Sequence, residues 1–182
     1  MVVDLAAFAQ WVHETALSDW LRHSLKAMPI IEAIHVMAAA TVFGTILVVD
    51  LRLLGWPSVQ RSFSKLHHEL VHWTWFAFAA AVVTGVLLFV VNSVTYYGNT
   101  AFRLKMLALL LAGVNMFVFE RVTGRDPAAW DKGSTPSAAR VAGALSITIW
   151  LSVLFIARWI GFTKGYDFSI PDDVNLDLNF GQ

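Results

Sequence analysis

Apolar residues dominate four long stretches of the chain, and short polar segments separate these stretches. A helix needs about 20 mostly apolar residues to cross a bilayer, because the hydrocarbon layer is roughly 30 Å thick and each residue adds about 1.5 Å. Four stretches meet that requirement, at about residues 30–50, 73–91, 102–122 and 141–160. The pattern therefore predicts an all-α integral membrane protein built as an antiparallel four-transmembrane-helix bundle, which occupies residues 29–163.

The segment before the bundle, residues 1–28, mixes tryptophan and leucine with charged residues. This mixture is typical of helices that lie in the plane of the membrane surface. We expect an N-terminal amphipathic interfacial segment of one or two short helices, with Ser18 as a candidate N-cap.

The segment after the bundle, residues 164–182, predicts an extended acidic tail. Apolar and polar residues alternate strictly from Val174 to Phe180, which is typical of a strand, but a single strand is not stable alone in water. One interpretation is that residues 166–182 dock on a protein partner as an added strand or in a groove. The alternative is a disordered acidic terminus.

Composition supports the membrane assignment and excludes other classes. Of the 182 residues, 57% are hydrophobic and 14% are charged, whereas soluble domains carry roughly a quarter charged residues. Lys plus Arg and Asp plus Glu each total 13, so the chain has no net basic field that would hold nucleic acid. The absence of cysteine excludes disulfides and Cys-ligated zinc or iron–sulfur centres.

The positive-inside rule gives a small bias in orientation. The two loop sides of the predicted bundle carry seven and six basic residues respectively: Arg52, Arg61, Lys65, Arg121, Arg125, Lys132 and Arg140 on one side, and Arg22, Lys26, Arg103, Lys105, Arg158 and Lys164 on the other. We therefore expect a multi-pass protein of the bacterial inner membrane, in contact with the lipid bilayer, with both termini on the non-cytoplasmic side.

Ionisable residues inside a membrane are costly, so each is a candidate functional residue. Glu32 and His35 lie three residues apart and share a helix face about one turn inside the first span. As a pair they could handle protons or bind a cofactor. The alternative is that they only pack at the start of the helix.

A second cluster matches the zinc-hydrolase pattern H-E-x-x-H through His68, Glu69 and His72. Glu120 lies at a similar predicted depth and could be a third metal ligand. Because the match is five residues long and stands at the start of a span, solvated interfacial histidines are the favoured interpretation.

Haem is a further candidate cofactor, and the positions of the histidines limit how it could be bound. Two histidines at one depth usually ligate a membrane b-type haem, but His35 and the pair His68/His72 belong to opposite membrane faces. A site within one subunit would therefore use His35 alone, or His35 with a methionine such as Met106 or Met116, or a ligand from another chain.

Four stretches together carry a family resemblance: MPIIEAIHVMAAATVFGTILVVDLRLLG, WTWFAFAAAVVTGVLLFV, AFRLKMLALLLAGVNMFVFE and ARVAGALSITIWLSVLFIARWIGF. They resemble a bacterial four-span family catalogued as a domain of unknown function, over roughly residues 5–163. Glu32, His35, Asp50 and Arg52 fit the family pattern, whereas a histidine is usual where this chain has Glu120. The topology is more loosely similar to copper-resistance membrane proteins and membrane protoporphyrinogen oxidases, which is an analogy of fold only.

We expect no catalytic set, and the leading hypothesis is a non-catalytic integral membrane subunit. It would anchor, assemble or stabilise a larger membrane complex, with the C-terminal tail docking on a partner. One alternative is a haem-binding or electron-transfer membrane protein that uses His35. The other is an intramembrane zinc hydrolase that uses His68, Glu69 and His72.

Overall fold

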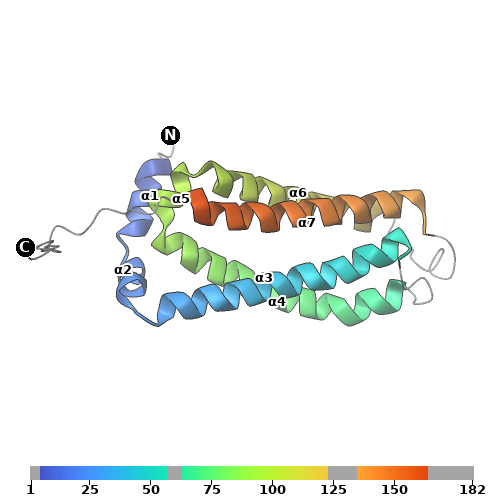
Figure 1. The fold of residues 1–182 in the computed structure, drawn as a ribbon, viewed down its shortest axis with the longest axis horizontal. Coiled ribbons are helices and arrows are strands. Elements are labelled where there is room, and N and C mark those ends of the chain that lie inside the picture. Colours follow the sequence, from blue (N-terminus) through green and yellow to red (C-terminus); the bar gives the residue numbers. More distant parts are fainter. Residues whose placement is uncertain (1–4, 57–62, 123–134, 164–182) are drawn as a thin grey trace, which may run out of the picture.

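The computed structural model describes residues 5–56, 63–122 and 135–163, and within these ranges all regular secondary structure is helical (Figure 1). The helices are α1 (Leu5–His13), α2 (Ala16–His23), α3 (Ala27–Leu54), α4 (Phe63–Val91), α5 (Ser93–Gly98), α6 (Thr100–Val122) and α7 (Ser137–Thr163). Of these, α3, α4, α6 and α7 are long and apolar enough to cross a membrane. The predicted all-helical, multi-pass membrane protein is thus confirmed. The predicted acidic tail, with its docking segment 166–182, lies outside the described residues.

Each long helix extends beyond the apolar stretch that predicted it. The extension is largest in α4, which begins at Phe63, ten residues before the predicted span at residue 73. The added residues include Lys65 and Glu69, which apolar patterning excludes from a span but which are good helix formers. Helix ends and membrane boundaries are therefore different positions in this chain.

The four long helices form two hairpins. In Figure 1, α3 leads away from the end that carries α1 and α2, α4 returns to it, and α6 and α7 repeat this path. Contacts are most extensive within the pairs α3–α4 and α6–α7, and the α3–α7 contact joins the pairs. Within the described ranges, no Cα atom of α4 lies within 8 Å of one in α6. In this part of the chain α4 and α6 meet through side chains, since the rings of Phe89 and Phe102 stack with their centroids 5.7 Å apart.

Glycine determines how closely two of these contacts approach. A Cβ atom at Gly143 of α7 would lie 3.1 Å from Leu53 Cβ and 3.2 Å from the Asp50 carbonyl oxygen of α3. At Gly85 of α4 it would lie 3.1 Å from His35 Cε1. A Cβ at Gly44 meets nothing within 4 Å, so this small residue of α3 makes no close helix contact. Small residues therefore mark some helix contacts here but not all.

Helix ends are capped by local hydrogen bonds. Gly55 ends α3 in the left-handed conformation (φ 88°), which glycine adopts without steric cost, and the Trp56 N–H bonds to the Leu51 carbonyl at 3.0 Å. The predicted cap of α2 is wrong: Thr15, not Ser18, is the N-cap, and its hydroxyl accepts from the Ser18 N–H at 3.3 Å. The Ser18 side chain is instead buried and donates to the Val90 carbonyl at 3.2 Å.

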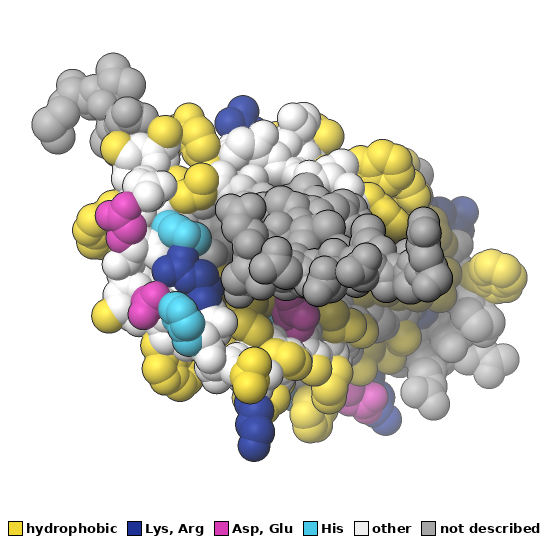
Figure 2. Space-filling model, turned by 60° about the vertical axis from the view of Figure 1, so that its left-hand side comes forward, with side chains coloured by type: hydrophobic (Ala, Val, Ile, Leu, Met, Phe, Trp, Pro, Cys, Tyr) yellow, Lys and Arg dark blue, Asp and Glu magenta, His cyan; other side chains and the backbone are white. Residues whose placement is uncertain are grey.

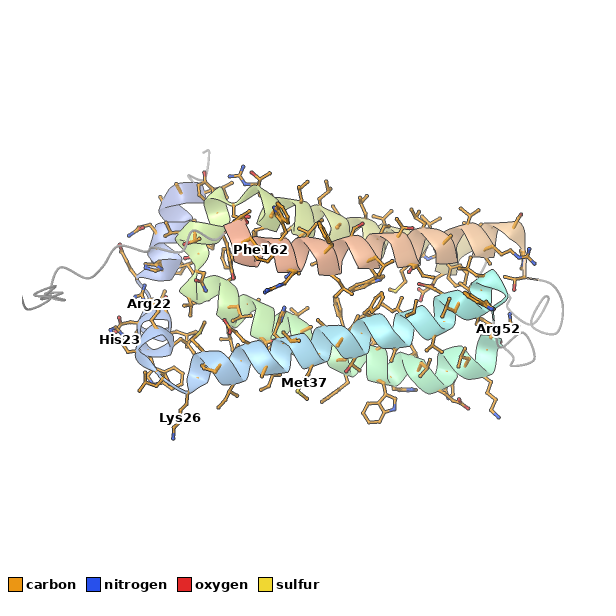
Figure 3. All side chains as sticks on the ribbon, in the orientation of Figure 1. Arg22, His23, Lys26, Met37, Arg52 and Phe162 are labelled. Carbon is orange, nitrogen blue, oxygen red and sulfur yellow. The ribbon has the colours of Figure 1, made fainter. Side chains whose placement is uncertain are left out.

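The short helices α1, α2 and α5 cover one end of the bundle (Figure 1). Ser93 at the start of α5 donates to the Ala9 carbonyl of α1 at 2.8 Å, which ties two of them together. Figure 2 looks toward this end and shows charged and histidine side chains beside hydrophobic ones. Figure 3 labels Arg22, His23 and Lys26 there, and Arg52 at the opposite end of the bundle. Large apolar side chains also face outward from α1 and α2, namely Leu5, Phe8, Trp11, Leu17 and Trp20.

Candidate ligand-binding cavity

A cavity of about 300 Å³ lies between the two hairpins, and residues of all four long helices line it. It lies between α4 and α6, and the Phe89–Phe102 ring contact that joins these two helices is not part of its lining. Aliphatic residues such as Val42, Ile46 and Val82 form much of its wall. Four aromatic side chains complete the apolar lining: Trp75, Phe78, Phe119 and Trp150. Most of the lining is apolar, as in most small-molecule sites.

The polar groups of the cavity lie toward the end that is distant from α1 and α2. They include Asp50 of α3, Asn115 and Glu120 of α6, and Ser146 of α7. Asn115 donates to the Ala142 carbonyl at 3.1 Å, so its amide joins α6 to α7. The residues of the described chain that line the cavity include no lysine, arginine or histidine.

Asp50 is the most enclosed of these polar groups, with 6% of its surface exposed. The Ser146 side chain hydrogen-bonds to its carboxylate. The Oδ2 oxygen is buried and has no hydrogen-bond partner in the described part of the chain. Since a buried carboxylate oxygen without a partner costs free energy, this atom is a candidate contact for a ligand.

The close α3–α7 contact explains why Asp50 and Ser146 meet. Gly143 has no side chain, so α7 can approach the backbone of α3 at Asp50. Ser146 is buried three residues further along α7, which places it on the same helix face as Gly143. The glycine thereby brings a hydroxyl donor to a carboxylate that would otherwise be separated from it.

Arg52 is the basic residue nearest to Asp50 in the sequence, but its side chain bonds to Thr135. Two residues apart on a helix, the two side chains point in different directions. Arg52 is 1% exposed, does not line the cavity, and donates from Nη1 to the Thr135 hydroxyl at 3.3 Å. The guanidinium therefore connects the end of α3 to the chain that enters α7.

The structure pairs His35 with Thr84 of α4 and not with Glu32. His35 Nδ1 lies 3.0 Å from the Thr84 hydroxyl, which itself lies 2.7 Å from the Ala80 carbonyl. Because the hydroxyl has one proton to donate to Ala80, His35 donates Nδ1–H to it and Nε2 carries the lone pair. Glu32 faces outward and makes no hydrogen bond or ion pair with His35 among the described residues.

His35 is not part of the cavity lining. Its ring packs against Gly85, where a side chain would collide with Cε1, and Lys105 of α6 lies within electrostatic range. An imidazole held through Nδ1 with Nε2 available is an arrangement that single-histidine ligation requires. Haem or metal binding at His35 stays a prediction.

The residues of the zinc-hydrolase pattern do not converge. His68 and His72 face outward on α4 with ring centroids 5.5 Å apart, and His72 Nδ1 lies 3.3 Å from the His68 carbonyl oxygen. Glu69 also faces outward, while Glu120 borders the cavity from α6. Across residues 5–56, 63–122 and 135–163, no three His, Asp or Glu side chains are placed to hold a metal ion.

Sequence reasoning identified Asp50 only through the family resemblance and did not identify Thr84 or Ser146. Both lie in apolar helices where a single hydroxyl is common, so no local pattern distinguishes them. Their roles depend on which turn of one helix faces which turn of another, and that register is set by packing at Gly85 and Gly143.

Fold and cavity together define a multi-pass, all-helical membrane protein with an interior site and no assembled metal centre in the described residues. Residues 5–163 match the model of a family of unknown function, DUF6644, and the chain belongs to that family. The resemblance to an uncharacterised domain-of-unknown-function family is therefore confirmed. Comparisons with curated proteins and with solved structures find no match.

Proposed function

We propose that this protein is a non-catalytic multi-pass membrane protein that binds a lipophilic small molecule between its two helical hairpins. The observation that carries the proposal is the cavity of about 300 Å³ lined by all four long helices. Small-molecule sites span roughly 300–1,000 Å³ and are mostly apolar with a few polar groups, which describes this cavity. Its ligand would be a compact molecule that dissolves in the bilayer.

The wide spacing of the α4 and α6 backbones beside the cavity supports a route of entry from the lipid. Packed transmembrane helices exclude lipid-soluble molecules from their interface, but these two helices have no Cα atoms within 8 Å of each other in the described ranges. The cavity lies between these two helices, and both contribute residues to its lining. A molecule dissolved in the hydrocarbon layer would therefore reach the site laterally, without passing through water.

The polar side chains around the cavity support binding rather than catalysis. Thr74 of α4 donates to Thr45 of α3 at 2.8 Å, and Asn115 bonds across to α7, so these groups join helices. Acid–base or nucleophilic catalysis needs a nucleophile with a base in hydrogen-bond reach. Within the described lining, Asp50 and Ser146 are the one carboxylate–hydroxyl pair, and no basic side chain accompanies them.

The proposed placement is an antiparallel bundle that crosses a bacterial inner membrane, with α1 and α2 at the non-cytoplasmic interface. Outward apolar side chains on α1 and α2 support it, because amphipathic helices lie with such residues among the lipid chains. The sequence also suggested that the protein is a subunit of a larger complex, and this hypothesis can be added to the proposal. It adds a protein partner held by residues 166–182 and an anchoring or assembling role in a larger membrane complex.

Filling the cavity tests the binding function. Gly113 lines the cavity and a Cβ there meets nothing within 4 Å, so Gly113→Leu adds volume to the cavity without a backbone clash. Gly44→Leu is the matched control, because Gly44 has equal space but does not line the cavity. We expect Gly113→Leu to weaken binding of the neutral dye N-phenyl-1-naphthylamine about tenfold or more in phosphatidylcholine nanodiscs, measured by fluorescence titration against empty discs.

The control should bind the dye as the parent protein does. Equal dye binding by all three proteins, or no binding above that of empty discs, would contradict the proposed cavity function.

A further inference from the structure

We infer that the cavity selects a lipophilic organic cation, an apolar or aromatic body that carries a protonated amine, and that Asp50 is the residue that recognises the amine. The inference rests on the proposed binding function and names the ligand class. It depends on three observations: the unpartnered oxygen of Asp50, the charges of the lining and its aromatic side chains.

Asp50 supplies a carboxyl group with an unpartnered oxygen at the polar end of the cavity. Its carboxylate is buried, lines the cavity and is held by Ser146. Oδ2 is left without a hydrogen-bond donor from the described residues. An ammonium group would donate to this oxygen, and a charge-assisted bond is shorter and roughly twice as strong as a neutral one.

The charge of the lining favours a cation over an anion. Glu120 is the second carboxylate of the cavity, and no Lys, Arg or His is among its described lining residues. Arg52, the basic residue closest to Asp50 in sequence, bonds to Thr135 outside the cavity. In an apolar environment charges interact more strongly than in water, so an anionic ligand would be repelled from this end.

The aromatic lining fits the rest of such a ligand. Trp75, Phe78, Phe119 and Trp150 line the same cavity, and tryptophan gives the strongest attraction of an aromatic ring for a cation. Two of these rings are held by edge contacts, Trp75 to Phe78 at 6.0 Å and Phe119 to Phe63 at 5.8 Å between centroids. A carboxylate combined with aromatic walls recognises an ammonium on an apolar body better than either feature alone.

Three probes of one shape and different charge test the inference. They are 1-naphthylmethylamine, 1-naphthylmethanol and 1-naphthoate, titrated at pH 7 by calorimetry into protein in phosphatidylcholine nanodiscs. We expect the amine to bind about five- to tenfold more tightly than the alcohol and the carboxylate to bind weakest, because a charge-assisted hydrogen bond is roughly twice as strong as a neutral one.

The variants assign the preference to one residue. Asp50→Asn keeps the shape and the Ser146 contact and should remove the preference for the amine, while leaving binding of the alcohol within about twofold. Asp50→Glu keeps the charge and should retain the preference. Glu69→Gln removes an outward carboxylate that does not line the cavity and should change nothing.

The two proposals fail in different ways. If Gly113→Leu reduces binding of the probes but the alcohol binds as tightly as the amine, the cavity function stands and the cation preference is overturned. The cation preference assigned to Asp50 is likewise overturned if Asp50→Asn still binds the amine more tightly than the alcohol. If no probe depends on residue 113, both the cavity function and the inference are overturned.

Discussion

At the residue scale, the absence of a side chain at Gly143 allows a close contact between the two hairpins. It lets α7 approach Leu53 and the backbone of Asp50, and Ser146 reaches the Asp50 carboxylate from the same face. The contact between the hairpins and the polar end of the cavity therefore depend on one position. Gly44, by contrast, is a glycine of α3 without a near neighbour.

We expect Gly143→Ala to lower the free energy of unfolding by about 1–3 kcal/mol, because the new methyl would lie 3.1 Å from Leu53 Cβ and 3.2 Å from a backbone oxygen that cannot move aside easily. Gly44→Ala has room for its methyl and should be neutral or stabilising by up to about 1 kcal/mol. Both are measured by SDS titration of the protein in mixed micelles. Equal stability of the two variants would show that the α3–α7 contact relaxes around the methyl group.

Residue-scale features of the site were only partly predictable. His35 stood out because an imidazole inside an apolar span is costly, and it is indeed half-buried at a helix contact. Glu32, three residues away on the same helix, was one candidate partner, but the structure places the Thr84 hydroxyl of α4 beside the ring. A sequence shows spacing within a helix, whereas the facing residue depends on how two helices pack.

At the element scale, apolar length identified the four long helices, since a helix satisfies its backbone hydrogen bonds within one apolar segment. The one cap that was predicted, Ser18, was wrong, and the other caps and the short helix α5 were not predicted, because their signals are single polar residues. Asn99 is an example: its side-chain oxygen accepts from the Phe102 N–H at 3.0 Å, and its amide donates to the Thr163 carbonyl and hydroxyl at 3.2 and 3.0 Å. One side chain therefore caps α6 and ties it to the end of α7.

Two substitutions separate these roles. Asn99→Ala removes the cap and the tie and should cost about 1–2 kcal/mol of unfolding free energy. Asn99→Asp keeps an oxygen for the Phe102 N–H but has no amide donor for Thr163, so we expect an intermediate loss. Thermal unfolding in detergent measures both variants. If the aspartate variant were as unstable as the alanine variant, the cap would contribute nothing to stability.

At the scale of the whole molecule, Lys26 precedes α3 at one end of the bundle (Figure 3), and Arg140 lies in the first turn of α7, which begins at the opposite end (Figure 1). Both side chains are exposed, and the chain has no native cysteine, so single cysteines at these positions are specific reporters. This arrangement, combined with the proposed membrane placement, makes the topology directly testable.

We expect Lys26→Cys to react with a membrane-impermeant maleimide added outside the cytoplasmic membrane, and Arg140→Cys to react only after permeabilisation. The reason is that some 30 Å of hydrocarbon would lie between the two positions. Labelling of intact spheroplasts followed by mass analysis measures this difference. The opposite pattern would reverse the proposed orientation, and equal labelling of both cysteines from outside would contradict a bundle that crosses the membrane.

The joining of the two hairpins through α3 and α7 has a consequence for the biogenesis of the protein. Helices α3 and α4 are consecutive, so this pair can form as soon as both have left the ribosome and entered the lipid, and the same holds for α6 and α7. The contact between the two pairs requires α7, the last helix of the described chain. The cavity requires α7 too, because Ala142, Ser146 and Trp150 belong to it. The cavity is thus completed only once α7 has been made, and a chain truncated before residue 137 would insert α3, α4 and α6 without forming it.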